Sequence, residues 1–239
     1  LTRFDRATGE ERDVQPFPRT FMGESSADVP ERWNWVYPIM MTRNKHLYAA
    51  SQHLWRSLDE GKTWDKISPD LTRADQETMG PSGGPIVLDQ DGPEIYATIF
   101  AVAPSEVDAD TIWVGSDDGL VHVSNGSDWI NVTPPDMVAN TRVSLIEASP
   151  HDAATAFVAA KRNQMGDRAP HIWKTHDSGK TWKRIVHGIR ANDFVHAIRE
   201  DPQRAGLLYA GTEHGVYVSF DEGDHWKSLS LNLPDVQVP

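Results

Sequence analysis

Thr175-His176-Asp177-Ser178-Gly179-Lys180-Thr181-Trp182 is the stretch that decides the fold. It recurs as Ser57-Leu58-Asp59-Glu60-Gly61-Lys62-Thr63-Trp64 and again as Ser219-Phe220-Asp221-Glu222-Gly223-Asp224-His225-Trp226. In the shared pattern, (S/T)-x-D-x-G-x-x-W, the Asp carboxylate can accept hydrogen bonds from the backbone N–H groups that follow it. Gly permits the positive φ of a tight reversal, and Trp begins the outgoing strand with a large apolar surface. Each copy predicts a hairpin turn, and three copies predict a repeat protein.

The segments around these turns repeat in the same order, as four short strands separated by turn residues. The tryptophans that follow the turns lie 65, 53 and 44 residues apart, at Trp64, Trp129, Trp182 and Trp226. The shortest spacing fits one blade of a β-propeller, which takes roughly 40–50 residues. The sequence therefore predicts an all-β propeller with four complete blades, 30–71, 72–136, 141–189 and 192–232, and a partial blade of outer strands over 1–18.

The second blade departs from the pattern. Its turn, Ser124–Trp129, is two residues shorter than the others, but Asn125-Gly126 is itself a hairpin signal. The longer spacings predict two insertions, 75–90 with the Gly-rich loop 80–85, and 161–170 inside the third blade. The loop 80–85 lacks the Lys and the following helix of a phosphate-binding loop, which argues against nucleotide binding.

Composition narrows the class of protein. The 239 residues contain 23 Lys and Arg against 35 Asp and Glu, a net charge of −12 that argues against nucleic acid as the main partner. No apolar run approaches the ~18–20 residues of a membrane span. There is no cysteine, so disulfides and thiolate metal sites are excluded, and no metal-ligand spacing of His or cofactor motif is found.

The chain begins with outer strands and ends just after a complete blade. An arc of a longer propeller is favoured over a closed ring of five, because the last residues are too short to complete the first blade. An arc exposes apolar blade faces. We therefore expect a homo-oligomer, or an association with remaining blades of a longer chain.

The turns resemble the Asp-box (BNR) repeats of sialidases, sortilin-type receptors, xyloglucanases and a photosystem II assembly factor. The blade order, with Leu208-Tyr209-Ala210-Gly211 before Val216-Tyr217-Val218-Ser219, is most similar to the bacterial sortilin-like, glycosyl hydrolase-type BNR proteins. The resemblance covers about residues 30–232 and implies an exported protein, extracellular or periplasmic. It implies a structural role for Asp59, Gly61, Trp64, Asp177, Gly179, Trp182, Asp221, Gly223 and Trp226. It does not choose between enzyme and receptor, because both carry such turns.

Strand alternation places the candidate ligand-binding surface at the rim opposite these turns. Candidate binding residues there are Arg32, Trp33, Trp35, Arg142, Arg162, Arg168 and His214, and candidate catalytic carboxylates are Asp117, Asp118, Asp193 and Glu213. Carboxylates, arginines and indoles together suit a groove for a polysaccharide or a peptide. Glycoside hydrolysis would use two of the carboxylates at a defined separation.

Each of these candidates also has a purely structural interpretation. Gly115–Gly119 and Gly211–Gly215 make good hairpin turns without any ligand, and this interpretation is favoured. Trp33 and Trp35 are two residues apart on a predicted strand, so both can face one surface of the blade. There they either pack in the core, which is favoured, or form a platform for sugar rings. His171, His176 and His187 are expected at the surface or in turns. The function favoured is a non-catalytic binding or scaffolding propeller; the alternative is a xyloglucanase-like glycoside hydrolase, and an assembly factor is a weaker third.

Overall fold

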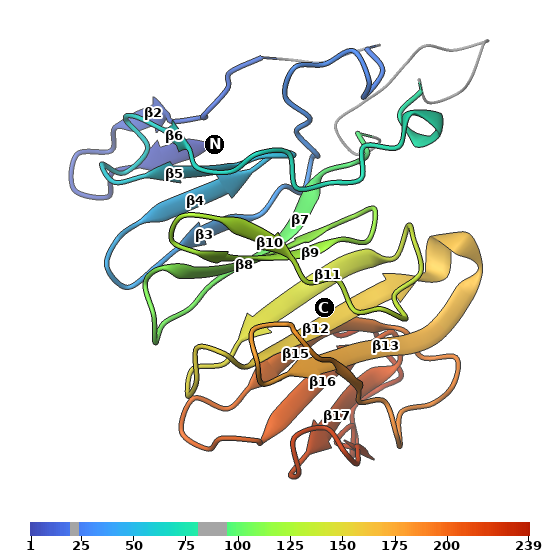
Figure 1. Ribbon diagram of the computed structural model, residues 1–239. Coiled ribbons are helices and arrows are strands. Elements are labelled where there is room, and N and C mark those ends of the chain that lie inside the picture. Colours follow the sequence, from blue (N-terminus) through green and yellow to red (C-terminus); the bar gives the residue numbers. More distant parts are fainter. Residues whose placement is uncertain (20–23, 81–94) are drawn as a thin grey trace. The chain divides into compact units, whose positions relative to one another are not determined.

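The computed structural model describes residues 1–19, 24–80 and 95–239, which form two compact units, Leu1–Ile99 and Phe100–Pro239. Regular structure in the described ranges is almost entirely β-strand (Figure 1). The helical turns described are the short 3-10 segments η1 (Gln76–Thr78) and η3 (Asn163–Met165). The all-β prediction is confirmed.

Within each sheet, every strand pairs antiparallel with the next one along the chain, and the described strands form four four-stranded sheets and a two-stranded one. The first unit contains β1 (Thr2–Phe4) with β2 (Glu11–Asp13), and the sheet of β3 (Ile39–Met41), β4 (Leu47–Ala50), β5 (Leu54–Ser57) and β6 (Asp65–Lys66). Next come β7 (Ile99–Pro104), β8 (Thr111–Ser116), β9 (Val121–Asn125) and β10 (Trp129–Asn131). The third sheet is β11 (Arg142–Ala148), β12 (Ala156–Arg162), β13 (Asp167–Thr175) and β14 (Lys183–Arg184), and the fourth is β15 (Val195–Glu200), β16 (Leu208–Thr212), β17 (Gly215–Ser219) and β18 (Lys227–Ser228). Sequential antiparallel sheets of this size are the blades of a β-propeller.

The three Asp-Gly turns (57–64, 175–182 and 219–226) share one hydrogen-bond pattern. In the third blade, Asp177 accepts from the backbone N–H of Thr181 at 2.8 Å and from its hydroxyl at 2.7 Å. The Thr175 hydroxyl donates to Asp177 and accepts from the Gly179 N–H. These donors hold the pKa of Asp177 down at about 2, with the Thr181 hydroxyl contributing most. The other two turns repeat the geometry, so the predicted role of the Asp is seen in all three.

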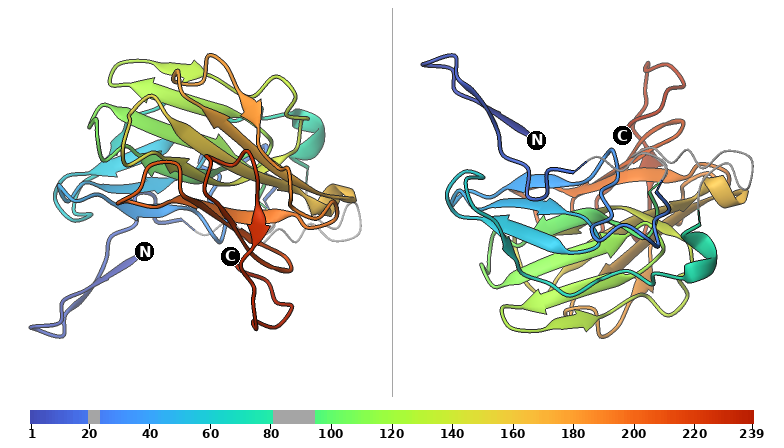
Figure 2. Two further views of the ribbon diagram at one scale, coloured as in Figure 1. Left: turned by 90° about the horizontal axis from the view of Figure 1, so that it is seen from below. Right: turned by 90° about the horizontal axis from the view of Figure 1, so that it is seen from above.

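Each Asp-Gly turn also contacts the outer strand region of the preceding sheet. The Trp182 indole N–H donates to the Val132 carbonyl at 2.7 Å, and Trp226 does the same to Ile185 at 2.9 Å. In the first unit, Trp64 donates to the Val14 carbonyl at 2.9 Å. This contact fixes the β1–β2 hairpin, drawn in dark blue in Figure 2, to the turn of the neighbouring sheet.

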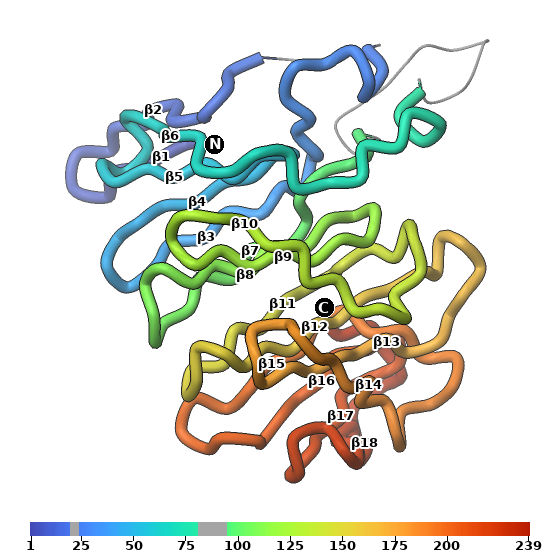
Figure 3. The backbone as a smooth tube through the Cα atoms, viewed as in Figure 1, coloured from blue at the N-terminus to red at the C-terminus, as the bar shows by residue number. Residues whose placement is uncertain are grey.

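Two apolar clusters fill the spaces between the sheets of the second unit. One contains Trp113, Val143 and Trp173, and the other contains Phe157, Ile198 and Leu208. Residues 156–160 of β12 are fully buried on both faces, because this strand lies between two neighbouring sheets. The tube in Figure 3 shows these sheets following one another along the chain.

Three details differ from the sequence-based expectation. Residues 33–37 are irregular rather than strand, so Trp33 and Trp35 do not alternate on a sheet. His171 is buried, since it stacks on Trp173 at 5.8 Å and bonds Asp167. The insertion at 161–170 prolongs β12 and β13 and closes them with η3, the gold coil in Figure 1. Most of the other insertion, 81–90, lies outside the described residues.

Candidate binding surface

The candidate residues lie at the end of each sheet opposite the Asp-Gly turns, which we call the loop end. It carries the connection between the second and third strands, such as 117–120 in the second sheet and 213–214 in the fourth. The loop ends of the two compact units are described separately, because each has its own chemistry.

Asp117 and Asp118 follow β8 and are almost completely buried. The Ser116 hydroxyl donates to Asp118 at 2.6 Å and accepts from the Leu120 N–H at 2.8 Å. Gly119, with φ of 89°, closes the turn. The Asp118 carboxylate is therefore part of its own hairpin.

Asp193 precedes β15 and has no exposed surface. Its two carboxylate oxygens accept from the His214 backbone N–H at 3.0 Å and from the Tyr217 hydroxyl at 3.1 Å. These bonds tie the start of the fourth sheet to the β16–β17 turn. The His214 side chain turns to Asp235, with its Nδ1 at 2.8 Å from the carboxylate.

Glu213 differs from the three candidate aspartates because 29% of its side chain is exposed. It lies 3.1 Å from Nε2 of His196, and Lys161 Nζ donates to Nδ1 of the same ring at 3.1 Å. Burial lowers the pKa of both Lys161 and His196, and for Lys161 the nearby Arg142 adds to the effect. A neutral His196 that accepts from Lys161 donates to Glu213 through Nε2.

Three arginines of the second unit lie at the same sheet ends as the hydrogen-bonded side chains of Lys161, His196 and Glu213. Arg142 lies opposite Lys161 in the β11–β12 ladder, and Arg162 is the next residue of β12. The Arg142 guanidinium stacks over Phe100 at 4.8 Å, and that of Arg168 over Phe194 at 5.4 Å. The structure thus brings Arg142, Arg162, Arg168 and Glu213 to one end of neighbouring sheets, together with Lys161 and His196, which the sequence analysis did not single out.

In the first unit, Arg32 is buried and fully engaged. Its side chain donates to the Ala97 carbonyl at 2.8 Å, to Asp70 at 2.6 Å and to Thr72 at 3.0 Å. A guanidinium held this way links segments that are far apart in the chain, and few of its N–H donors remain for a ligand.

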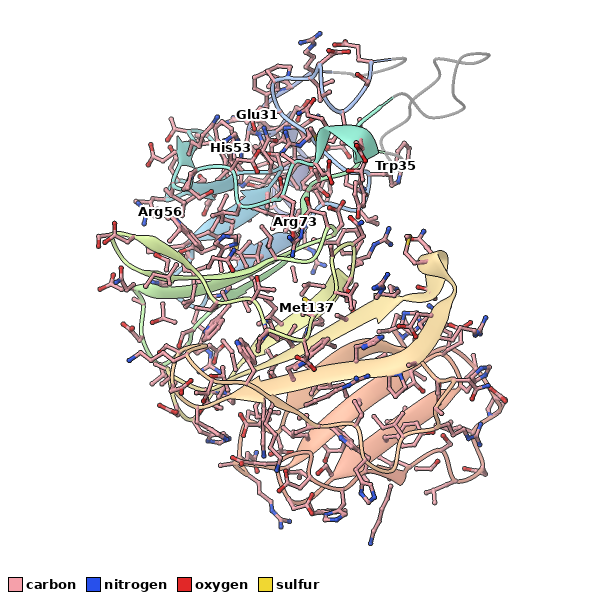
Figure 4. The ribbon with its side chains drawn as sticks, turned by 45° about the vertical axis from the view of Figure 1, so that its right-hand side comes forward. Glu31, Trp35, His53, Arg56, Arg73 and Met137 are labelled. Atoms are coloured by element: carbon pink, nitrogen blue, oxygen red, sulfur yellow. The ribbon has the colours of Figure 1, made fainter. Side chains whose placement is uncertain are left out.

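The tryptophans of the first unit have different environments. Trp33 packs edge-on against Tyr37 at 4.9 Å and lies 6.5 Å from Trp55. Trp35 projects outward with 75% of its surface exposed, and Figure 4 shows it at the side of the unit away from Glu31. Of the two candidate tryptophans, it is Trp35 that presents an open indole face.

A buried carboxylate network in the first unit was missed from the sequence. Glu31 lies 2.9 Å from Nδ1 of His53, 2.5 Å from Nζ of Lys66 and 2.8 Å from the Ser51 hydroxyl; Figure 4 shows Glu31 and His53 adjacent. Burial alone would raise the pKa of Glu31, but these three donors outweigh it and lower that pKa to about 2. No motif marks the network, because its members are up to 35 residues apart.

Among the described ranges, no cluster of three or more His, Asp or Glu side chains is arranged to hold a metal ion. Within the same ranges, no helix is long and apolar enough to cross a membrane.

The fold and the placement of these residues define the class of protein as a β-propeller, and comparisons with known proteins agree. A solved structure of an ancestral GH74 enzyme superposes with a TM-score of 0.61 at 19% identity, over 84% of this chain and 25% of that one. The GH74 xyloglucanase from Xanthomonas campestris gives 0.57 at 16%, over 84% and 31%. The extracellular domain of a putative one component system from B. thetaiotaomicron gives 0.56 at 11%, over 92% and 25%.

In sequence, the chain is similar to the oligoxyloglucan-reducing end-specific xyloglucanase of Emericella nidulans, at 28% identity over 107 residues. That match covers 44% of this chain and 13% of the xyloglucanase. No protein-family model matches. The chain therefore spans a small part of its relatives, and the likeness establishes the propeller fold.

Proposed function

We propose that this chain is part of an exported Asp-box (BNR) propeller that binds a polysaccharide at its loop ends without cleaving it. The observation that carries the proposal is the state of the candidate carboxylates. Asp118 is buried and bonded within its own hairpin, Asp117 is buried beside it, and Asp193 is buried and bonded to the β16–β17 turn. Glu213 is partly exposed but faces His196.

Glycoside hydrolysis requires two carboxyl groups roughly 5–10 Å apart on either side of an open site, one of them protonated. A buried carboxylate whose oxygens accept hydrogen bonds from its own protein is not presented to a sugar oxygen. This arrangement supports binding over catalysis at the residues named.

The aromatic side chains of the first unit support a sugar as the ligand. Exposed indole faces stack on the apolar faces of sugar rings, and Trp35 offers such a face. Trp33, two residues before it, packs with Tyr37 and Trp55. The names of similar proteins include xyloglucanases, so xyloglucan is the natural probe.

Two further features support the family and the location. All three Asp-Gly turns share carboxylate, hydroxyl and indole hydrogen bonds, which supports the structural role that the Asp-box resemblance implies for their Asp, Gly and Trp residues. Similar solved structures include an extracellular domain, which supports export to the periplasm or the cell exterior.

Calorimetric titration of the chain with xyloglucan oligosaccharides tests the proposal. We expect binding that weakens about tenfold in Trp35→Ala, since one stacked aromatic is worth ~1 kcal/mol or more. Phe220→Ala, which removes an exposed aromatic at an Asp-Gly turn, is the matched control and should bind normally. Absence of binding would refute the proposal.

A xyloglucanase-like glycoside hydrolase is the second candidate, favoured by the sequence similarity to a xyloglucanase. Reducing-end release from xyloglucan decides between the two. Release that disappears in Asp118→Asn or Glu213→Gln would establish the hydrolase in place of the binding protein.

A further inference from the structure

At the loop end of the third sheet, the positive charge of the side chains exceeds the negative charge of the nearby carboxylates that could pair with them. Arg142, Lys161, Arg162 and Arg168 gather there, on a protein whose net charge is −12. None of the described residues forms a salt bridge with any of the three arginines, whereas Arg3, Arg32 and Arg199 each have a carboxylate partner. Glu213 and Asp167 are nearby but are bonded to His196 and His171.

Two of these arginines carry buried hydrogen-bond donors that no described residue satisfies. The Nε atoms of Arg142 and Arg162 are out of contact with solvent and have no acceptor among the described residues. A buried donor on a charged group without an acceptor is costly, by more than an ordinary unmade hydrogen bond. Since solvent does not reach these two Nε atoms, a ligand would meet the side chains at their terminal nitrogens.

The chemistry of two guanidinium groups at one end of a strand ladder favours a planar anion. Arg142 and Arg162 are on adjacent strands at the same end of the β11–β12 ladder, and stacking on Phe100 restrains the plane of Arg142. A guanidinium can bind a carboxylate through its two terminal nitrogens, with two parallel hydrogen bonds. Lys161 adds a third positive charge, held in place by His196.

We propose that this cluster, Arg142, Lys161 and Arg162, binds the carboxylate of an acidic sugar, a uronate unit of the polysaccharide. The choice of a sugar rests on the proposed function; the choice of a carboxylate rests on the arginines alone. The amide side chains of Asn163 and Gln164 follow Arg162 directly and can bond sugar hydroxyls beside the carboxylate. An acidic peptide would match cations spaced along a groove better than cations gathered at one ladder end.

Calorimetric titration of the whole chain with trigalacturonate, and with its neutral methyl ester, tests the site. The acid should bind, and the ester should bind at least about tenfold more weakly, because it cannot form charge-assisted bonds. Arg142→Gln and Arg162→Gln should each weaken trigalacturonate binding about tenfold or more. Arg204→Gln, which removes one positive charge between β15 and β16, where Arg204 stacks on Phe220 of an Asp-Gly turn, should not.

Two controls separate a lost ligand contact from a damaged fold. Arg142→Lys keeps the charge and loses the paired terminal nitrogens, so it should also weaken binding while its thermal unfolding stays close to that of the parent chain. Binding of xyloglucan through Trp35 should be unchanged in all of these variants. If xyloglucan binds and trigalacturonate does not, the uronate site is wrong and the proposed function stands.

The remaining outcomes are equally decisive. Trigalacturonate bound equally by the parent chain and both Gln variants would refute the cluster. Poly-glutamate bound as tightly as trigalacturonate, with the same dependence on Arg142 and Arg162, would overturn the sugar and establish an acidic peptide site.

Discussion

Replacing Gly179 by Ala tests whether an Asp-Gly turn joins neighbouring sheets or only reverses the chain. Gly179 has φ of 81°, and an added Cβ would lie 2.5 Å from the Val132 Cβ and 2.8 Å from its Cγ2. The left-handed conformation costs ~1–2 kcal/mol for a residue with a Cβ. Displacing Val132 and the turn adds about 1–3 kcal/mol, the usual cost of overpacking. We therefore expect a loss of roughly 2–5 kcal/mol in the free energy of unfolding.

The second unit contains its own control. Gly166 has nearly the same φ, 80°, but a Cβ added there would meet no heavy atom within 4 Å, so Gly166→Ala carries the conformational cost alone. Urea unfolding followed by tryptophan fluorescence measures both variants in the same unit. At a slope of ~1–3 kcal/mol per molar urea, the midpoint of Gly179→Ala should fall roughly 1 M below that of Gly166→Ala. Equal losses would show that the contact with Val132 contributes nothing and that the turn acts only locally.

Three other predictions concern acid, the buried carboxylate and association. The three turn aspartates have pKa values of about 2, below the ordinary 3.8, so they stabilise the fold fully above about pH 5 and lose this effect as pH falls toward 2. Thr181→Val removes the main hydrogen-bond donor to Asp177. The urea midpoint of this variant should therefore fall less between pH 6 and pH 2.5 than that of the parent chain. Glu31→Gln should lower the melting temperature more than Lys66→Gln, because Glu31 is buried with three donors while Lys66 is 40% exposed, and equal shifts would contradict this account. The chain should self-associate at micromolar concentration in light scattering, since β1 pairs only with β2 among the described strands and leaves Phe4 58% exposed; a monomer, or no change in Phe4→Ser, would argue against this surface.

Strand alternation predicts which end of a sheet a candidate residue occupies, but not what its side chain contacts there. Strand alternation was enough to place Asp118, Asp193 and Glu213 at the ends of sheets opposite the Asp-Gly turns. Whether a carboxylate at such an end faces outward depends on donors elsewhere, such as the Tyr217 hydroxyl, 24 residues from Asp193. No local pattern carries that information.

The sequence by itself determined the fold, because the turns are made by neighbours in the chain. Asp177, Gly179 and Thr181 are within five residues of each other, and their hydrogen bonds depend on spacing alone. Only the tertiary structure decided that Trp182 reaches the Val132 carbonyl, 50 residues away, and that Lys66 reaches Glu31. Those contacts form only after the strands have assembled and packed. The free energy that selects this packing comes from apolar surface contributed by many segments, so no single segment of the sequence specifies it.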